Sequence, residues 1–169
     1  METIINSQLM RYLEDQQLIS DRQYGFCRGR SAGDLLGYLT HRWVEAVESK
    51  GKALAVSLDI AKAFDRVWHK ALLSKLPSYE LPEKLCNWIP SFLADRSIKV
   101  VVDGACFDYK PINAGVPQDC VLSTTLFLLH IIDILQISNI HFYADDSTGD
   151  ALYTGRSNIS RENFAEYRD

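Results

Sequence analysis

The sequence has 169 residues, of which 47% are hydrophobic and 24% are charged. This length and hydrophobic content are enough for one globular domain with its own core, and they exclude an intrinsically disordered segment. The formal net charge of −4 by itself argues weakly against nucleic acid as a partner, because proteins that bind polyanions are usually basic on at least one face.

The charges are unevenly distributed along the chain. Residues 22–110 contain 14 Lys and Arg against 10 Asp and Glu, whereas residues 111–155 contain five Asp and no Lys or Arg. Carboxylates without nearby compensating charges need cations, water or a distant basic surface. We therefore expect the acidic segment to meet one of these in the folded protein.

The cysteines and the N-terminus show no metal or targeting signal. The four cysteines form no C-x-x-C pair and have no His at zinc-site spacing, so we expect a reduced, intracellular chain without disulfides. No basic region precedes an apolar stretch at the N-terminus, and no apolar run approaches the roughly 18 residues of a membrane span. We expect neither a signal peptide nor a membrane partner.

The chain begins with a predicted helix and an irregular loop. Ile5, Leu9 and Leu13 recur at helical spacing and predict an N-terminal helix. The segment 23–34, QYGFCRGRSAGD, is rich in Gly and Arg and predicts a loop.

Two further helices are expected on either side of a strand. Asp34 is the predicted N-cap of a helix that ends at Gly51. Residues 53–59, ALAVSLD, predict a buried strand. A helix is then expected over residues 67–76, with Pro77 ending it.

The middle of the chain predicts a short helix and a hairpin. Pro82 suits the first position of a helix that runs to Trp88 and that Pro90 ends or kinks. The segment 98–110, IKVVVDGACFDYK, has an Asp-Gly pair between two β-rich runs, which predicts a hairpin with a type I′ turn.

The last third contains an apolar helix and more strands. Residues 121–135 are apolar nearly all round and predict a buried helix. Residues 139–155 return to strand-like composition, with Asp145 and Asp146 at or near a turn, and residues 160–169 predict the start of an amphipathic helix. Helices and strands interleaved with a hairpin indicate an α+β fold.

The adjacent carboxylates of Asp145 and Asp146 are open to two interpretations. Neighbouring strand residues point to opposite faces, so a solvent-exposed Asp-Asp-Ser turn is one of them. The other follows from Asp59, which also ends a β-type run, because two strands can bring their terminal carboxylates together across a sheet. Such carboxylates repel unless they share a divalent cation, and oxygen ligands favour Mg²⁺ or Mn²⁺. Two ions about 3.5–4 Å apart can align the attacking and leaving oxygens of nucleotidyl transfer.

Four segments in this order resemble the reverse transcriptase domain of non-LTR retrotransposons, most closely jockey-like insect elements. They are QYGFCRGRSAGDLL, AVSLDIAKAFDRVWHKALLSKL, NAGVPQDCVLSTTLFLLHIIDIL and FYADD. The resemblance covers nearly the whole chain and implies a partial right-hand polymerase, with a palm sheet and flanking helices. It implies a fingers segment over residues 1–52 and a palm over residues 53–169, truncated after the YADD turn, with the thumb absent.

The resemblance also implies the catalytic and metal-binding residues. Asp59, Asp145 and Asp146 match the family's acidic set, which holds two Mg²⁺ or Mn²⁺ ions. Phe64 stands where the family keeps an aromatic residue beneath the sugar, which excludes the ribonucleotide 2′-hydroxyl; core packing is its other interpretation. Gln118 matches the glutamine near the incoming nucleotide.

Further substrate contacts are expected from the loops. Gly115 shapes the loop that carries the glutamine, and Lys62 lies close enough in sequence to the acidic residues to reach a triphosphate. Arg28 and Arg30 match the segment that approaches template and triphosphate, where a planar guanidinium suits phosphate oxygens; solvated loop charges are the alternative.

Other polar residues are expected to be structural. Asp65 is a predicted cap or turn carboxylate, His69 a surface imidazole, and Asp150 a turn residue.

Four residues depart from the family's usual pattern. They are Cys27 in place of arginine, Asp119 in place of glycine, Thr124 in place of proline and Ile132 in place of asparagine. Asp119 matters most, because two like unit charges 4 Å apart repel by about 4 kcal/mol at an effective dielectric of 20.

Two alternative functions are therefore considered for the chain. The first is an RNA-directed DNA polymerase fragment that uses an RNA template, a DNA primer and dNTPs and is incompetent alone. The second is a catalytically dead retrotransposon remnant, at most an RNA- or protein-contact module. The resemblance implies the cytoplasm and the nucleus as locations.

Overall fold

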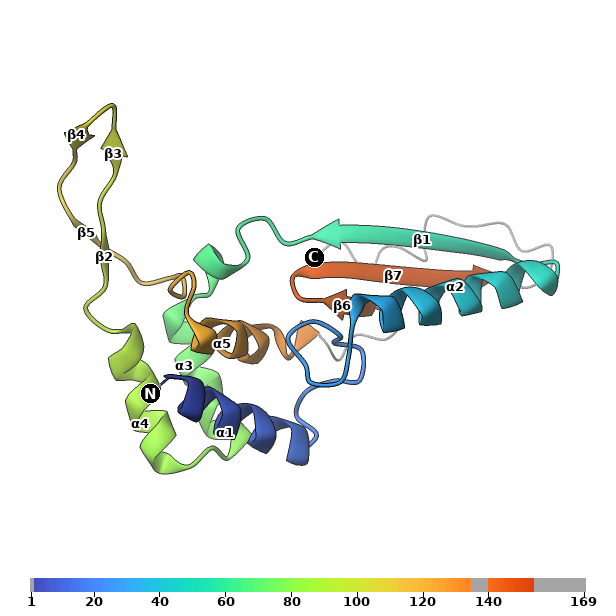
Figure 1. Ribbon diagram of the computed structural model, residues 1–169, viewed down its shortest axis with the longest axis horizontal. Helices are drawn as coiled ribbons and strands as arrows, with labels where there is room; N and C mark the ends of the chain where they lie inside the picture. Colours follow the sequence, from blue (N-terminus) through green and yellow to red (C-terminus); the bar gives the residue numbers. More distant parts are fainter. Residues whose placement is uncertain (1, 135–139, 154–169) are drawn as a thin grey trace. The chain divides into compact units, whose positions relative to one another are not determined.

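A computed structural model describes residues 2–134 and 140–153 of the chain (Figure 1). These residues form two compact units, each assembled from two separate stretches of sequence. The first unit contains residues 2–21 and 60–134, and the second contains residues 22–59 and 140–153. Both helices and strands are present, which confirms the predicted α+β class. The predicted helix over 160–169 lies outside the described residues.

The first unit is mainly helical, and its helices pack around one apolar helix. α5 packs against α1 and α3, and α3 also packs against α4. Eight residues of α5 are buried, so the predicted buried helix is confirmed. The elements of this unit, in chain order, are α1 (Glu2–Asp15), η1 (Phe64–Arg66), α3 (His69–Lys75), η2 (Leu76–Tyr79), α4 (Glu83–Leu93), β2 (Ser97–Ile98), β3 (Val101–Val102), β4 (Ala105–Cys106), β5 (Lys110–Pro111) and α5 (Val121–Ile131).

The N-terminal helix α1 forms where its apolar spacing predicts it. Leu9 and Leu13 are fully buried, and Met10 is buried beside them. The contact with α5 also includes a hydrogen bond from the Thr125 hydroxyl to the Asn6 side chain. The helical spacing of the apolar residues therefore corresponds to the face that packs on α5.

The prolines end helices less completely than their positions predict. α3 ends at Lys75, but the chain continues directly into the 3-10 turn η2, which contains Pro77. Pro82 is the N-cap of α4 rather than its first residue, and Pro90 lies inside α4, which continues to Leu93. The prediction that α4 stops at Trp88 is wrong, because Ile89 and Leu93 are buried and packing of that face outweighs the lost hydrogen bond.

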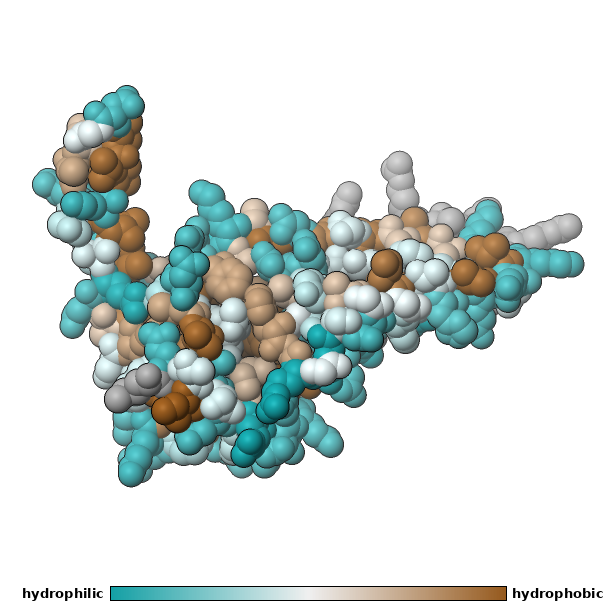
Figure 2. Space-filling model, viewed as in Figure 1, coloured by the Kyte–Doolittle hydropathy of each residue, from teal (hydrophilic) through white to brown (hydrophobic). Residues whose placement is uncertain are grey.

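The predicted hairpin is confirmed, including its turn. β3 pairs with β4, and both turn residues between them have positive φ, 49° at Asp103 and 82° at Gly104, as a type I′ turn requires. β2 pairs with β5 at the base of the same hairpin. Figure 2 shows hydrophobic surface along this hairpin, and Val101 and Phe107 are more than half exposed.

The second unit is a three-stranded antiparallel sheet covered by one long helix. Its strands follow the order β1-β7-β6, so β7 is central and pairs with both neighbours. The helix α2 packs against all three strands. The bounds are α2 (Ala32–Glu48), β1 (Lys52–Asp59), β6 (Ile140–Tyr143) and β7 (Asp146–Tyr153).

The start of α2 differs from its prediction. Ser31 is the N-cap, and its hydroxyl accepts a hydrogen bond from the Asp34 backbone N–H. The Asp34 carboxylate in turn accepts from the Ser31 backbone N–H, which completes a capping box. The prediction that Asp34 is the N-cap is therefore wrong by three positions, although its carboxylate does stabilise this helix end.

The strand β1 forms over the predicted residues but is not buried. No residue of β1 is buried, and Leu58 is 46% exposed. The reason is topological: β1 lies at the edge of the sheet, with β7 as its partner in the described part of the chain. The apolar run in 53–59 therefore predicted the strand correctly and its burial wrongly.

Candidate active site

The hairpin β6–β7 places the two adjacent aspartates at a tight turn. Tyr143 pairs with Asp146, which leaves Ala144 and Asp145 as a two-residue loop. Ala144 has φ 61°, a conformation that costs an L-residue roughly 1–2 kcal/mol. Positive φ at the first loop residue alone matches a type II′ turn, which normally has Gly there. Strain of this kind is concentrated at functional sites.

Asp59 and Asp146 lie directly opposite each other on neighbouring strands. Asp59 is the last residue of β1 and Asp146 the first residue of β7, and the register of the two strands pairs them. Side chains of such a pair share one face of the sheet, with Cβ atoms roughly 4.5–5.5 Å apart. Both residues are exposed, and Asp145 follows Ala144 in the adjacent turn. The strand ends thus bring two of the three predicted carboxylates together.

The carboxylates are suitable ligands for a cation, but they are not arranged as a complete cation site. Within residues 2–134 and 140–153, no group of three or more His, Cys, Asp and Glu side chains is arranged to hold a metal ion. Two carboxylates on one sheet face nevertheless supply the hard oxygen donors that Mg²⁺ and Mn²⁺ prefer. The paired Asp59 and Asp146 therefore fit a divalent cation, and Asp145 is the nearest further donor along the chain.

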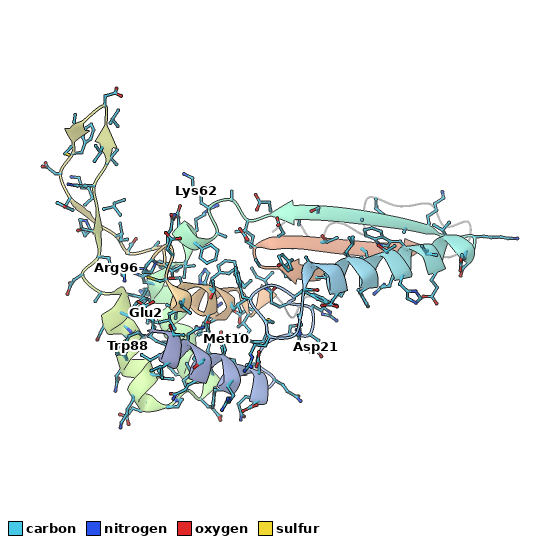
Figure 3. All side chains as sticks on the ribbon, viewed as in Figure 1. Glu2, Met10, Asp21, Lys62, Trp88 and Arg96 are labelled. Carbon is cyan, nitrogen blue, oxygen red and sulfur yellow. The ribbon has the colours of Figure 1, made fainter. Side chains whose placement is uncertain are left out.

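A pocket in the first unit gathers three of the predicted substrate residues. It encloses about 740 Å³ and is lined by Lys62, Gly115 and Gln118, together with Asp65 and Arg96. Figure 3 labels Lys62 and Arg96, which supply two positive charges to the lining. Arg96 is not predicted from the sequence, because it lies outside the four motifs, directly before β2 at the base of the hairpin. Two cations around a cavity of this size suit an anionic ligand.

Gly115 shapes the wall of this pocket. Its φ is 92°, and a Cβ at this position would lie 3.2 Å from the backbone oxygen of Asp65. The Gly115 N–H donates to the Val67 oxygen, and the Gly115 oxygen accepts from Nε2 of His69 at 2.7 Å. His69 is thus structural as predicted, but it is buried, and the prediction of a surface imidazole is wrong.

Gln118 and Asp119 follow on the same loop. Gln118 is exposed, and its Nε2 donates a long hydrogen bond, 3.4 Å, to Oδ1 of Asp65. Asp119 has φ 60°, a left-handed conformation that glycine adopts without strain. Asp119 is not among the described residues that line the pocket. The backbone at Asp119 thus has the geometry of a glycine position, and Asp119 directly follows the lining residue Gln118 without lining the pocket itself.

Phe64 lies half-buried at the start of η1. Its ring stacks on that of Phe127 from α5, with centroids 5.0 Å apart and an interplanar angle of 26°. This contact belongs to the core of the first unit, as the packing interpretation of Phe64 expects. Its backbone oxygen accepts from the Val116 N–H and ties η1 to the pocket loop.

The two predicted arginines have different surroundings. Arg28 is exposed on the loop before α2. The guanidinium of Arg30 donates to the backbone oxygen of Gln23 at 2.7 Å, so it supports the fold of this loop.

Asp150 does not lie in a turn, and that prediction is wrong. It lies within β7 with a fully buried side chain, and Oδ2 is 3.3 Å from Nη2 of Arg42 on α2. The hydrogen bond from Arg42 to the Tyr38 hydroxyl, and after it the charge of Asp150, raise the pKa of the Arg42 guanidinium. A basic residue far away in sequence thus compensates one carboxylate of the acidic segment, as Lys75 does for Asp133.

The chain matches one protein family over most of its length. A family model described as reverse transcriptase (RNA-dependent DNA polymerase) matches residues 1–149, and the chain belongs to this family. The chain is 37% identical over 134 residues to the RNA-directed DNA polymerase from mobile element jockey of Drosophila melanogaster, which covers 79% of this chain and 14% of that protein. It is 32% identical over 144 residues to the probable RNA-directed DNA polymerase from transposon BS of the same species, covering 85% of this chain and 16% of that protein.

A third relative, matched over a shorter stretch, is the retrovirus-related Pol polyprotein from type-1 retrotransposable element R2 of Popillia japonica. The identity is 33% over 90 residues, which cover 53% of this chain and 15% of that protein. The chain therefore spans about one sixth or less of the length of these relatives. In its described residues, no helix has both the length and the apolar character needed to cross a membrane.

Proposed function

We propose that this chain carries part of the active site of an RNA-directed DNA polymerase. The reaction transfers a nucleotide from a dNTP to the 3′-hydroxyl of a DNA primer paired with an RNA template. The observation that supports it most is the direct pairing of Asp59 with Asp146 beside the Ala144–Asp145 turn, in a chain of the reverse transcriptase family. In this proposal the sheet β1-β7-β6 belongs to the palm, and residues 1–52 belong to the fingers.

The carboxylates of Asp59, Asp145 and Asp146 are the proposed ligands of Mg²⁺ or Mn²⁺. Their placement at strand ends keeps their oxygens at the edge of a hydrogen-bonded sheet, which limits the motion of the backbone that carries them. When bound, two such ions neutralise phosphate charge and lower the pKa of the attacking hydroxyl. In the reaction the primer 3′-hydroxyl gives up its proton to solvent and its oxygen bonds to the α-phosphorus, while the bond from the α-phosphorus to the oxygen that bridges to the β-phosphate breaks and pyrophosphate leaves.

The pocket of the first unit is the proposed site of the dNTP. Lys62 and Arg96 would contact the triphosphate as cations, and Gln118 would contact the nucleotide from the pocket wall. Gly115 contributes by leaving space that a side chain would fill. Phe64 is the proposed gate against the 2′-hydroxyl, and Arg28 and Arg30 are proposed contacts to the template or the triphosphate.

The test has two parts, since the chain is expected to need further segments for turnover. Any primer extension on an RNA template with Mg²⁺ or Mn²⁺ should depend on the carboxylates, and measurable extension of equal rate by the unmodified chain and Asp145→Asn would overturn the proposal. Titration with Mn²⁺ should give affinities more than ~10-fold weaker for Asp59→Asn and Asp146→Asn. Asp103→Asn at the tip of the β3–β4 hairpin is the matched control. It removes one carboxylate that is distant in sequence from Asp59 and Asp146, and asparagine suits the type I′ turn at this position.

A second candidate function is a catalytically inactive reverse transcriptase domain that contacts only RNA or protein. Asp119 favours it, because a carboxylate beside the pocket opposes a triphosphate. Titration with dTTP in the presence of Mn²⁺ separates the two candidates. Metal-dependent dTTP binding supports the polymerase, and Mn²⁺ binding without dTTP binding supports the inactive domain.

A further inference from the structure

The loop before α2 pairs with β6 through a single β-bridge. Gln23 and Phe142 form a parallel bridge, in which the Phe142 N–H donates to the Arg22 oxygen and the Tyr24 N–H donates to the Phe142 oxygen, each at 2.8 Å. The strand that leads into the aspartate turn is therefore paired on both sides, with β7 and with residues 22–24. This loop and the turn are more than 110 residues apart in sequence but belong to one unit.

The side chain of Gln23 forms hydrogen bonds with the turn itself. Gln23 is fully buried, and its Oε1 accepts hydrogen bonds from the N–H groups of Ala144 at 3.2 Å and Gly25 at 2.9 Å. Its Nε2 donates to the Ala144 oxygen at 3.3 Å. The side-chain amide thus meets both backbone polar groups of Ala144. The opposite amide orientation would face two N–H donors with an NH₂ group, so these bonds define the orientation.

Gly25 allows this close approach. A Cβ on Gly25 would lie 2.1 Å from the backbone nitrogen of Ala144, which no structure tolerates without movement of the backbone. The loop backbone therefore lies directly against the turn, and Gln23 is held in place by this contact and by the Arg30 guanidinium on its own backbone oxygen.

These hydrogen bonds constrain Ala144, the residue of the turn with a positive φ. Its positive φ is unfavourable for alanine, so an unsupported turn would relax toward other conformations. Any rotation there redirects Asp145 and the first residue of β7, Asp146. Bonds to both the N–H and the oxygen of Ala144 oppose that rotation, because each bond is lost if the peptide planes turn.

We infer that Gln23 is a positioning residue for the metal-binding carboxylates: it holds the Ala144–Asp145 turn in the conformation that directs Asp145 and Asp146 at a divalent cation. The inference rests on the proposed function, because it assigns to Gln23 the preorganisation of that cation site. Outer residues that orient ligands typically change metal affinity by roughly 10- to 100-fold when replaced.

The experiment uses the full chain and three variants. Gln23→Met keeps the volume and loses all three bonds, whereas Gln23→Glu keeps the two acceptor bonds and loses the donor. Leu39→Ala is the matched control, because Leu39 is buried in α2 of the same unit and its truncation removes core packing without removing a hydrogen bond to the turn. Hydrogen exchange of the Ala144 amide is measured by NMR without metal, and Mn²⁺ affinity by titration, under conditions in which circular dichroism shows each variant folded.

The expected result separates positioning from stability. In Gln23→Met, the Ala144 amide should exchange faster and Mn²⁺ should bind roughly 10-fold more weakly or worse. Gln23→Glu should give values between those of Gln23→Met and the unmodified chain. Leu39→Ala should leave the Mn²⁺ affinity unchanged. If Gln23→Met leaves either the Ala144 exchange rate or the Mn²⁺ affinity unchanged, this inference is overturned and the proposed function is not affected. An equal loss of Mn²⁺ affinity in Leu39→Ala would also overturn it. If the unmodified chain binds no Mn²⁺, the proposed function fails, and the inference fails with it.

Discussion

Asp59 at the end of β1 and Asp146 at the start of β7 are directly paired across antiparallel strands, although 86 residues separate them in sequence. Like charges in directly opposed positions destabilise a sheet. A pairing that works against stability is understandable where a cation joins the two groups, since the cation converts repulsion into a shared interaction.

The first prediction concerns this repulsion without metal. Asp146→Asn should raise the free energy of unfolding by about 0.5 kcal/mol in low salt, because it removes one of two opposed charges. The gain should shrink as ionic strength rises from about 0.01 M to 1 M, since salt screens exposed charges. Urea unfolding in the presence of a chelator measures it. A gain of the same size at both salt concentrations would show that repulsion with Asp59 is not its cause.

The second prediction concerns the buried pair of Asp150 and Arg42. Arg42→Met should cost about 3 kcal/mol or more of stability, because it leaves a fully buried carboxylate without its partner. The double variant Arg42→Met with Asp150→Asn should recover much of that loss, since no unpaired charge remains. Denaturant unfolding of both single variants and the double variant gives the coupling between the two side chains. Additive losses would contradict the pairing.

The third prediction is a pH dependence from His141. Burial, and the nearby charges of Arg22 and Arg42, lower the pKa of His141 below its ordinary 6.5, against the opposing effect of Asp150. The unfolded chain therefore takes up a proton that folded His141 resists. His141 should not reduce the free energy of unfolding above pH 6.5, and it should reduce it increasingly as the pH drops below 6.5. Unfolding measured from pH 8 to pH 5 tests this.

The control for the pH dependence is His141→Phe, which keeps an aromatic ring against Tyr38 without a titrating group. It should reduce the loss of stability at low pH but not abolish it. Burial, and then the charge of Lys75, also lower the pKa of His130, which therefore contributes in the same direction. A pH profile unaltered by His141→Phe would contradict the assignment.

The fourth prediction concerns Asp119. Asp119→Gly should strengthen Mn²⁺-dependent dTTP binding several-fold, because it removes a negative charge beside the pocket; the full Coulomb term of about 4 kcal/mol at 4 Å is an upper bound for an exposed group. Glycine also adopts the left-handed conformation of this position without strain. Calorimetric titration measures the change, with Asp108→Gly on the exposed hairpin as control. Equal affinity before and after Asp119→Gly would remove Asp119 as an obstacle to nucleotide binding.

Local sequence determined those features whose cause is local. The Asp-Gly pair at 103–104 predicts its turn because both residues tolerate positive φ, and the apolar run of α5 predicts burial on every side. The ordered motifs likewise predicted the family that the comparison then showed. Burial of β1 could not be predicted in this way, because an apolar run does not reveal whether its strand is central or at an edge.

Tertiary structure alone decided which distant residues meet. The pairing register brings Asp59 to Asp146, β7 buries Asp150 against Arg42, and the loop before α2 brings the Gln23 amide to Ala144. Each of these contacts joins residues more than 80 positions apart, and each depends on strand order and helix packing rather than on local propensity. The sequence by itself thus determined the chemistry of the candidate site and the family of the protein, whereas only the folded sheet decided which carboxylates pair and which side chain holds their turn.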